Sequence, residues 1–415
     1  MRLSPAWLRA GGIAAAGVTL VACAASSGAG RVPAATHPPG TASGALVGVP
    51  ASSPWPPIPL PAGASAAQAM AIATVTARMS PAQLAGQRVI FSYAGLNPPA
   101  ALLSLISHGE AAGVIFFTGN YASQAQITSV IARLDQADAA SANPVRAPLL
   151  LMTDQEGGQV RRLLGPPYNS ERAIGESASP AAAARSAGAR AAANLRGVGL
   201  NVNLAPVLDV YRSAGDFDDQ FGRSYSSNPR TAAALGADFI AAQQAGGVAA
   251  TAKHFPGLGT AGTKQNTDLR PVTLNVSAAV VRSVDELPYP AAIGAGVKLV
   301  MVSWAVYPAL DPARPAGLSA TIVQGELRGR LGFAGVTITD AMEAGALKPY
   351  GPIPGRALLA AQAGMDLMLC SAQSVAEGTQ CLAGLRGGYS SGTLPRPVFL
   401  AAAARVIALR ASLPR

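Results

Sequence analysis

Short apolar runs separated by longer mixed segments recur along the chain from about residue 66 onward. Runs of this length without polar alternation are typical of strands that are buried on both faces of a parallel sheet. Eight of them can be counted, at residues 88–93, 113–117, 148–153, 199–204, 248–254, 297–303, 335–339 and 365–370. The pattern therefore predicts eight strands.

Segments of helical length separate most of these runs, and they are rich in Ala or amphipathic. They include residues 124–140, 181–195, 229–244 and 319–331, the last of which begins at Ser319, a plausible N-cap. Eight alternating strand and helix units predict an α/β fold of the (β/α)8 TIM-barrel type. A doubly wound open sheet is the alternative. It would not require eight units, and the chain has no Gly-x-Gly-x-x-Gly turn after a strand.

The first 65 residues have a different character. Arg2 and Arg9 precede an uncharged stretch, residues 10–22, which ends at Cys23. This arrangement predicts a secretory signal over residues 1–23, and Leu20-Val21-Ala22-Cys23 resembles the bacterial lipobox, whose Cys is lipidated. An ordinary signal peptide with a chance Cys is the alternative. Residues 24–65, rich in Pro, Ala, Ser and Gly, predict a linker before a single domain at 66–415.

Composition limits the class of protein. With 50% hydrophobic and 13% charged residues among 415, the chain can bury a large core. Its net charge of +10 comes from scattered Lys and Arg, so the sequence does not predict a nucleic-acid partner. If the protein is exported, Cys370 and Cys381 are the remaining pair that could form a disulfide; two buried thiols are the alternative.

Polar residues follow several of the predicted strands. The third run is followed by Asp154, the fourth leads to Asp209, the fifth contains Lys253 and His254, and the seventh is followed by Asp340. Because barrel enzymes carry their chemistry at the carboxyl ends of the strands, we expect these side chains to lie together. His108 precedes the second strand, so we expect it at the opposite end, with a structural role.

Four segments in this order carry a resemblance to a known family: Asp154-Gln155-Glu156-Gly157-Gly158, residues 203–209, Lys253-His254-Phe255-Pro256-Gly257 and Ile338-Thr339-Asp340. Together they resemble glycoside hydrolase family three over residues 79–407, and most closely its single-domain β-N-acetylhexosaminidases. The resemblance implies a retaining exo-glycosidase that removes terminal β-linked N-acetylglucosamine through a covalent glycosyl-enzyme, without a metal or organic cofactor.

The resemblance also implies roles for particular residues. Asp340 matches the family's nucleophile. Asp154, Arg162, Arg223, Lys253 and His254 match positions that bind sugar hydroxyls, and Asp209 is a weaker member of this set. Their chemistry is suitable, because hydroxyls accept hydrogen bonds from Arg and Lys and donate them to Asp. Arg161 and Arg162 are interchangeable in this alignment, and Asp209 would also suit a loop cap.

The chain departs from this branch in the loop that normally carries an acid/base His. The protein has only His37, His108 and His254, and none falls in that loop. Alignment on Pro271 places Asp268 at the missing position. A buried carboxylic acid can serve as the acid/base, so we expect Asp268 in this role; Asp216, Asp218 and Asp219 are the alternatives. Trp304 replaces a His that the family often carries.

We therefore expect a glycoside hydrolase that acts on cell-wall glycan fragments. Its rivals are a sugar-binding lipoprotein with little turnover, and a β-glucosidase-like or phosphorolytic relative. The expected partners are a carbohydrate substrate and, through Cys23, the outer face of the cytoplasmic membrane. We expect a monomer without a bound metal.

Overall fold

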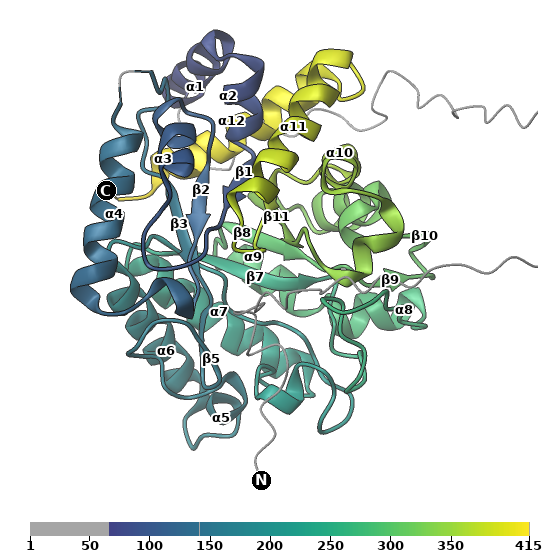
Figure 1. Ribbon diagram of the computed structural model, residues 1–415. Coiled ribbons are helices and arrows are strands. Elements are labelled where there is room, and N and C mark those ends of the chain that lie inside the picture. The colour runs from purple at the N-terminus through teal and green to yellow at the C-terminus, as the bar shows by residue number, and fades with distance from the viewer. Residues whose placement is uncertain (1–65, 141, 415) are drawn as a thin grey trace, which may run out of the picture. The chain divides into compact units, whose positions relative to one another are not determined.

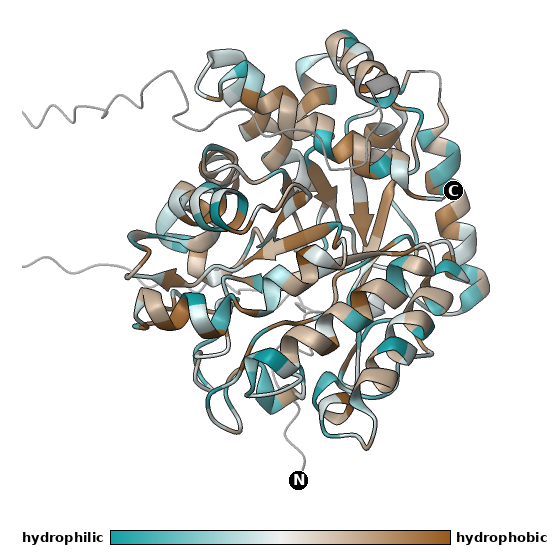
Figure 2. Cartoon of the chain, turned by 180° about the vertical axis from the view of Figure 1, so that it is seen from behind, coloured by the Kyte–Doolittle hydropathy of each residue, from teal (hydrophilic) through white to brown (hydrophobic). Residues whose placement is uncertain are grey.

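The computed structural model describes residues 66–140 and 142–414. Eight parallel strands form a closed barrel at its centre, surrounded by helices (Figures 1 and 2). In their order around the barrel the strands are β1 (Val89–Phe91), β12 (Leu367–Leu369), β11 (Val336–Ala341), β8 (Leu299–Val302), β7 (Ala249–Phe255), β6 (Val202–Asn203), β3 (Leu150–Thr153) and β2 (Gly113–Ile115). Each of the eight predicted runs contains one strand. The (β/α)8 prediction is confirmed, and the open sheet is wrong.

Helices follow the strands on the outside of the barrel. The α-helices are α1 (Ala66–Arg78), α2 (Pro81–Gly86), α3 (Ala100–Ser107), α4 (Gln124–Asp138), α5 (Glu171–Gly175), α6 (Pro180–Arg196), α7 (Pro229–Ala245), α8 (Ala278–Val280), α9 (Pro288–Gly294), α10 (Ile353–Ala363), α11 (Val375–Ser391) and α12 (Arg396–Ser412). Shorter or wider turns are η2 (Thr118–Asn120), η3 (Asp219–Phe221), η4 (Val281–Asp285), η5 (Ala316–Leu318), η6 (Thr321–Arg330) and η7 (Gly345–Tyr350). Two antiparallel pairs, β4 (Gln155–Gly157) with β5 (Val160–Arg161) and β9 (Val306–Tyr307) with β10 (Asp311–Pro315), lie outside the barrel.

Side-chain spacing explains how the layers pack. In α4 the buried residues Ile127, Val130, Ile131 and Leu134 recur at helical spacing, and the hydroxyl of Ser123 caps the helix by accepting from the Gln126 amide. The helices α6 and α7 pack closely, because a Cβ at Gly188 would lie 2.3 Å from the Phe239 carbonyl oxygen. Small residues on α6 thus bring its backbone close to α7.

The barrel interior is apolar and is closed at its amino-terminal end by α12. Val406 and Leu409 of α12 belong to the same buried cluster as barrel residues such as Leu150 and Ile338. The guanidinium of Arg405 donates to Asp366, just before β12, at 2.7 Å. This end of the barrel is thus filled, and the carboxyl end of the strands is left for a functional site.

One predicted helix differs in type. Residues 319–331 were expected to form an α-helix that begins at Ser319, whereas η6 has the wider π-type hydrogen bonding and begins at Thr321. The Ser319 hydroxyl still accepts from the Ile322 amide at 3.3 Å, and it donates to Asp311 at 2.6 Å. Ser319 therefore joins this helix to β10 as well as capping it.

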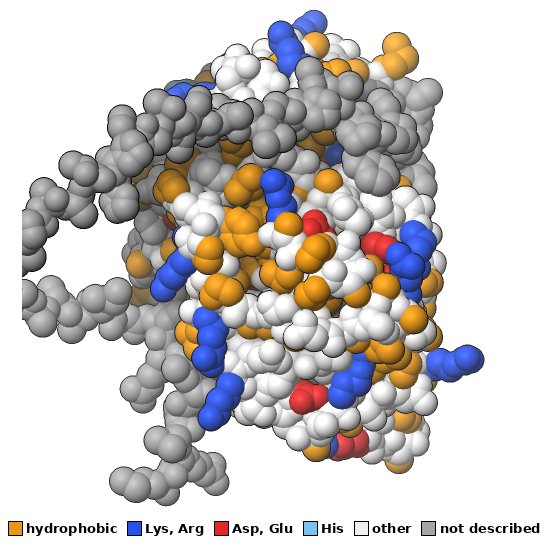
Figure 3. Space-filling view, turned by 90° about the vertical axis from the view of Figure 1, so that its right-hand side faces the viewer, with side chains coloured by type: hydrophobic (Ala, Val, Ile, Leu, Met, Phe, Trp, Pro, Cys, Tyr) orange, Lys and Arg blue, Asp and Glu red, His pale blue; other side chains and the backbone are white. Residues whose placement is uncertain are grey.

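Several sequence predictions concern features that the fold does not decide. The signal segment, Cys23 and the linker lie outside the described residues. None of the helices within the described ranges has the length and apolarity to span a membrane. The Sγ atoms of Cys370 and Cys381 are buried and 2.8 Å apart, as two thiols, so a disulfide stays a prediction. On the face in Figure 3, outside the grey atoms, Lys and Arg are spread among other side chains and form no single patch.

Candidate active site

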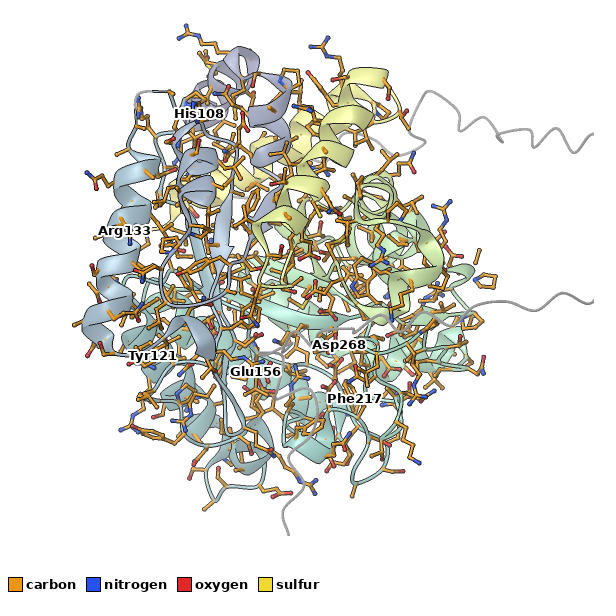
Figure 4. The ribbon with its side chains drawn as sticks, in the orientation of Figure 1. His108, Tyr121, Arg133, Glu156, Phe217 and Asp268 are labelled. Carbon is orange, nitrogen blue, oxygen red and sulfur yellow. The ribbon has the colours of Figure 1, made fainter. Side chains whose placement is uncertain are left out.

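The predicted site residues come from the carboxyl ends of different barrel strands. Asp154 directly follows β3, and Asp209 lies in the loop after β6. Lys253 and His254 lie near the end of β7, and Asp340 is the second-last residue of β11. Figure 4 shows Glu156 and Asp268 toward one end of the barrel and His108 toward the other. At that far end His108 follows α3 and its Nδ1 lies 2.7 Å from the Ser104 carbonyl oxygen. The strands therefore gather the site residues and leave His108 apart.

One part of the site consists of carboxylates bonded to cations; we call Asp154, Glu156, Arg223 and Lys253 the ion-paired group. The Lys253 ammonium lies 2.9 Å from Asp154 and 2.6 Å from Glu156. Arg223 bonds both oxygens of Glu156, from Nε at 2.9 Å and from Nη2 at 3.0 Å. This two-point geometry holds the guanidinium plane in one orientation.

Electrostatics keep the ion-paired carboxylates charged. Burial by itself would raise the pKa of Glu156, but Arg223 and Lys253 outweigh it and lower this pKa to about 2. The pKa of Asp154 is likewise lowered, because Lys253 and then Arg162 oppose the effect of burial. The group is thus a fixed set of charges, suited to bind polar partners rather than to exchange protons.

The structure distinguishes the two neighbouring arginines. Arg162 Nε lies 3.7 Å from an Asp154 carboxylate oxygen. Arg161 instead donates to the Gly165 carbonyl oxygen at 2.7 Å, and its guanidinium lies 5.1 Å from the centre of the Tyr168 ring. Arg162 is therefore the arginine that extends the ion-paired group.

His254 is held by the buried carboxyl group of Asp209. Its Nδ1 lies 2.7 Å from Asp209 Oδ2, and its backbone amide donates to the other Asp209 oxygen at 3.3 Å. Asp209 also accepts from the Leu258 amide at 2.6 Å, so it orients the loop after β7 as well as the imidazole. Burial, the largest effect, lowers the pKa of His254 to about 4. We assign the proton to Nδ1 because its partner is a carboxylate, which leaves Nε2 as an acceptor.

Asp209, Asp218 and His254 form the one group of His, Cys, Asp or Glu side chains in the described ranges whose atoms are close enough to share a metal ion. The facing atoms of Asp209, Asp218 and His254 lie within 4.8 Å of one another. They already bond each other, and Arg223 donates to Asp218, so a divalent cation would meet an adjacent positive charge. Burial raises the pKa of Asp218 to about 6. A proton shared between Asp218 and Asp209 fits this arrangement better than a metal.

A second set of acidic side chains has a different environment; we call Asp268, Asp340, Glu343 and Glu377 the carboxyl cluster. Among the described residues, none of the four forms an ion pair with Lys, Arg or His. Burial, followed by the nearby Asp268, raises the pKa of Asp340. Part of Asp268 faces solvent, but protein surrounds it on its other sides, and this burial raises its pKa, as does Glu343. The pKa shifts of this cluster are therefore upward, opposite to those of the ion-paired group.

The remaining alternatives for the acid have other contacts. Asp216 Oδ2 accepts from the amides of Arg212 and Ser213 at 2.9 and 2.7 Å and so closes a turn. Asp219 bonds Arg172 at 2.7 Å and the Gly215 amide. Of these three, only Asp218 belongs to the site.

Trp304 is buried beside the end of β11. Its side chain is 1% exposed and its indole N–H donates to the Ala341 carbonyl oxygen at 2.8 Å. A Cβ at Gly317 would lie 2.5 Å from the ring, so a glycine is needed behind it. Trp304 thus supports Ala341, the residue that follows Asp340.

Sequence analysis missed three functional candidates: Glu156, Glu343 and Glu377. A usable signal existed for Glu156, because it lies two residues after Asp154, just beyond the end of the same predicted strand. In extended backbone, side chains two residues apart point to the same side. Glu343 lies three residues after Asp340, but nothing in the sequence pairs it with Glu377. That pairing depends on β11 and β12 being neighbours.

Comparison with known proteins identifies relatives. A model of the glycosyl hydrolase family 3 N-terminal domain matches residues 77–409. The chain is 44% identical over 329 residues to an uncharacterized secreted glycosyl hydrolase of Arthroderma benhamiae, spanning 79% of this chain and 93% of that protein. It is 33% identical over 313 residues to a β-hexosaminidase of Xylella fastidiosa, spanning 73% and 89%. The structure of a β-N-acetylhexosaminidase from Beutenbergia cavernae matches with a TM-score of 0.74 at 31% identity, covering 80% of this chain and 99% of that one.

Proposed function

The chain belongs to glycosyl hydrolase family 3 and is a glycoside hydrolase, and on that premise we propose that it is a retaining exo-β-N-acetylhexosaminidase. The observation that carries this proposal is the contrast at the barrel mouth. Asp340 and Asp268 have raised pKa values and no cation partner among the described residues, beside a group of fixed charges. The named β-hexosaminidase and β-N-acetylhexosaminidase relatives support the choice of sugar.

A retaining reaction needs one ionised and one protonated carboxyl group. Such enzymes use a nucleophile and a proton donor about 5 to 5.5 Å apart. Since Asp268 and Asp340 disfavour each other's charge, one proton serves both groups. We assign the charge to Asp340, whose carboxylate accepts from the Ala341 amide at 2.8 Å and is stabilised by the positive charge of Lys253, and the proton to Asp268.

In the first step Asp340 attacks the anomeric carbon while the bond from that carbon to the leaving oxygen breaks. Asp268 donates its proton to the leaving oxygen. In the second step the Asp268 carboxylate takes a proton from water, the water oxygen bonds the anomeric carbon, and the bond to Asp340 breaks. Two inversions leave the sugar with its original β configuration.

The ion-paired group and His254 bind the sugar. Asp154 accepts hydrogen bonds from hydroxyl groups, and Arg162, Arg223 and Lys253 donate to them. His254 Nε2 accepts, with Asp209 fixing the ring. Because Glu156 already bonds both Lys253 and Arg223, these cations are held in place before the sugar arrives.

Asp218 is the rival for the acid. Its pKa, raised to about 6, would suit that task. However, Asp218 is 2% exposed and one of its carboxylate oxygens accepts from Arg223, which leaves it little access to a leaving group. Asp268, which faces the solvent side of the mouth and acts directly on Asp340, is the better donor.

The proposal is tested by release of the aryl group from an aryl β-N-acetylglucosaminide by the purified protein. We expect turnover that falls by about 10⁴-fold or more in Asp340→Asn, because the nucleophile is lost. Asp238→Asn, a carboxylate in a surface pair with Arg185, is the matched control and should keep full activity. Turnover that survives in Asp340→Asn would contradict the nucleophile assignment.

The same assay separates the rival functions. A sugar-binding protein would bind N-acetylglucosamine without releasing any aryl group, in both the unaltered and the Asp340→Asn protein. A β-glucosidase-like enzyme would prefer the aryl β-glucoside. A phosphorolytic enzyme would form a sugar 1-phosphate when phosphate is added.

For location, we propose an exported protein anchored through a lipid on Cys23, acting on cell-wall glycan fragments as part of peptidoglycan turnover. The support is the charged, apolar and Cys-terminated order of residues 1–23. Phase separation in detergent tests this: the native protein should enter the detergent phase and Cys23→Ser the aqueous phase. Equal partition of the two proteins would exclude the anchor.

A further inference from the structure

The loop that carries Asp268 is attached to the turn that follows Asp340. The Gly345 amide donates to the Asp268 carbonyl oxygen at 2.7 Å, and the Ala346 amide donates to the Thr267 carbonyl oxygen at 2.9 Å. A Cβ at Gly345 would lie 2.2 Å from the Leu269 carbonyl oxygen. The two segments therefore approach as closely as they do because residue 345 has no side chain.

A pair of acidic side chains lies beside this contact. Glu343 accepts from the Ser371 hydroxyl at 2.8 Å, and Glu377 accepts from the Ala372 amide at 2.8 Å. Their other oxygens, Glu343 Oε2 and Glu377 Oε1, are buried and have no hydrogen-bond partner among the described residues. Each carboxyl group also affects the pKa of the other. A proton held between the two groups would satisfy both buried oxygens and leave the pair with one negative charge.

We propose that Glu343 is a positioning residue for the acid/base group: held by Glu377 and Ser371, it presents a negative charge that keeps the Asp268 carboxyl protonated until the leaving oxygen takes the proton. This inference rests on the proposed function, in which Asp268 is the proton donor. It assigns to Glu343 an electrostatic task and no contact with the substrate.

The other charged groups around Asp268 do not replace Glu343. Asp218 and Asp154 act on Asp268 in the same direction but are bonded to cations, and Arg223 acts in the opposite direction. Arg356 is the cation that faces the pair from α10. Its guanidinium donates to the carbonyl oxygens of Gly351 and Met342, at 2.7 and 2.9 Å. The charge of the pair is therefore not cancelled by a direct ion pair.

The decisive experiment is the pH profile of kcat/KM for Glu343→Gln, measured on an unactivated N-acetylglucosaminyl disaccharide. The amide keeps the size of the side chain and removes its charge. We expect the basic limb of the profile to move down by about one pH unit or more, since a like charge near Asp268 is lost. Turnover above that limb then falls about tenfold on the disaccharide. On an aryl glycoside with a good leaving group it should stay close to that of the unaltered enzyme.

Three further variants separate charge from structure. Glu377→Gln can still donate to Glu343, which is then the ionised partner, so the limb should stay near its original pH. Glu110→Gln removes a carboxylate that precedes β2, at the opposite end of the barrel, and should not move the limb. Gly345→Ala, whose Cβ must displace the loop, should lose disaccharide turnover while keeping activity on the activated substrate.

The outcomes are distinguishable. A basic limb that stays in place in Glu343→Gln overturns this inference, including the case in which turnover drops equally on both substrates, as a merely structural role would cause. If Asp268→Ala loses the same fraction of activity on both substrates, Asp268 is not the acid, and the proposed mechanism and this inference fall together. A shifted limb with leaving-group dependence in Asp268→Ala supports both.

Discussion

The barrel mouth holds two sets of acidic side chains that behave in opposite ways. In the ion-paired group, Glu156 is bonded by Arg223 and Lys253 and its pKa is lowered to about 2. In the carboxyl cluster, Glu377 is also buried, but its neighbour is the carboxyl group of Glu343. Burial and this neighbour raise the pKa of Glu377 to about 8. Both are Glu residues with little exposed surface. The difference shows that the partner, rather than the residue type or its burial, decides whether a carboxyl group holds a charge or a proton.

This division matches the two tasks of a glycosidase. Hydroxyl recognition needs charges that stay constant while the sugar binds, and in the proposed mechanism the ion-paired group has this task. Bond cleavage needs one ionised and one protonated carboxyl group that exchange roles, and the proposal assigns these to the cluster around Asp340. Lys253 and His254, adjacent on β7, extend the binding side toward Asp340.

After loss of the nucleophile, the largest expected effect comes from removing the proton donor. Asp268→Ala should lower turnover of an unactivated disaccharide by about 10² to 10⁴-fold, the usual contribution of a general acid. It should have much less effect on substrates whose leaving group needs no proton. Steady-state kinetics on a series of aryl glycosides of rising leaving-group pKa measures this, with Asp216→Ala as the control in the neighbouring loop. Equal losses along the series would assign Asp268 to a different role.

The same substitution at two carboxyl groups should next give different stabilities. Glu156→Gln leaves Arg223 and Lys253 short of a buried counter-charge, so we expect a loss of about 3 kcal/mol or more in the free energy of unfolding. Glu343→Gln removes a charge from a site that disfavours it, so the loss should stay below about 1 kcal/mol. Denaturant unfolding at neutral pH gives both values. Similar losses would mean that the two environments do not differ as described.

The pH dependence of stability should also have opposite signs in the two sets. The pKa of Glu377 is about 8 in the folded protein and about 4.3 when unfolded, so its contribution is complete below the unfolded value and is lost as pH rises through 8. The pKa of Glu156 is about 2, so its contribution is present above the unfolded value and is lost as pH falls through 2.

We therefore expect Glu377→Gln to flatten the decline in stability between about pH 4.3 and about pH 8, which are the unfolded and folded pKa values of Glu377. Urea unfolding across that window, beside Glu110→Gln as the control, is the measurement. A decline that is unchanged in Glu377→Gln would place the titrating group elsewhere in the protein.

Much of the fold followed from the sequence, because the signal is local. Each strand is a continuous apolar run, and each has helical segments or turns on both sides, so the period of the pattern alone indicates a barrel. The type of η6 did not follow, since hydrogen bonding to the fourth or the fifth preceding residue depends on packing against neighbours. Asp154, Lys253 and Asp340 lie at or just after the ends of apolar runs in the sequence. This position also predicted that they would lie at the carboxyl end of the barrel.

Spatial relations within the site were much less accessible. The sequence alignment left Arg161 and Arg162 interchangeable, and the structure separates them because only Arg162 faces Asp154. It also left three aspartates in residues 216–219 as possible acids. Two of them, Asp216 and Asp219, bond the backbone of their own loop, a detail of loop conformation that no residue pattern reveals.

By itself, then, the sequence determined the barrel, the end at which chemistry occurs, and the residue types available there, because these depend on hydrophobic periodicity and on chain order. Only the tertiary structure decided which carboxyl group is charged. Glu156 meets Lys253 across 97 positions of sequence, and Glu343 approaches Glu377 across 34, because the folded barrel brings distant segments to the same end. Protonation depends on distances between such groups, and those distances exist only in the folded chain.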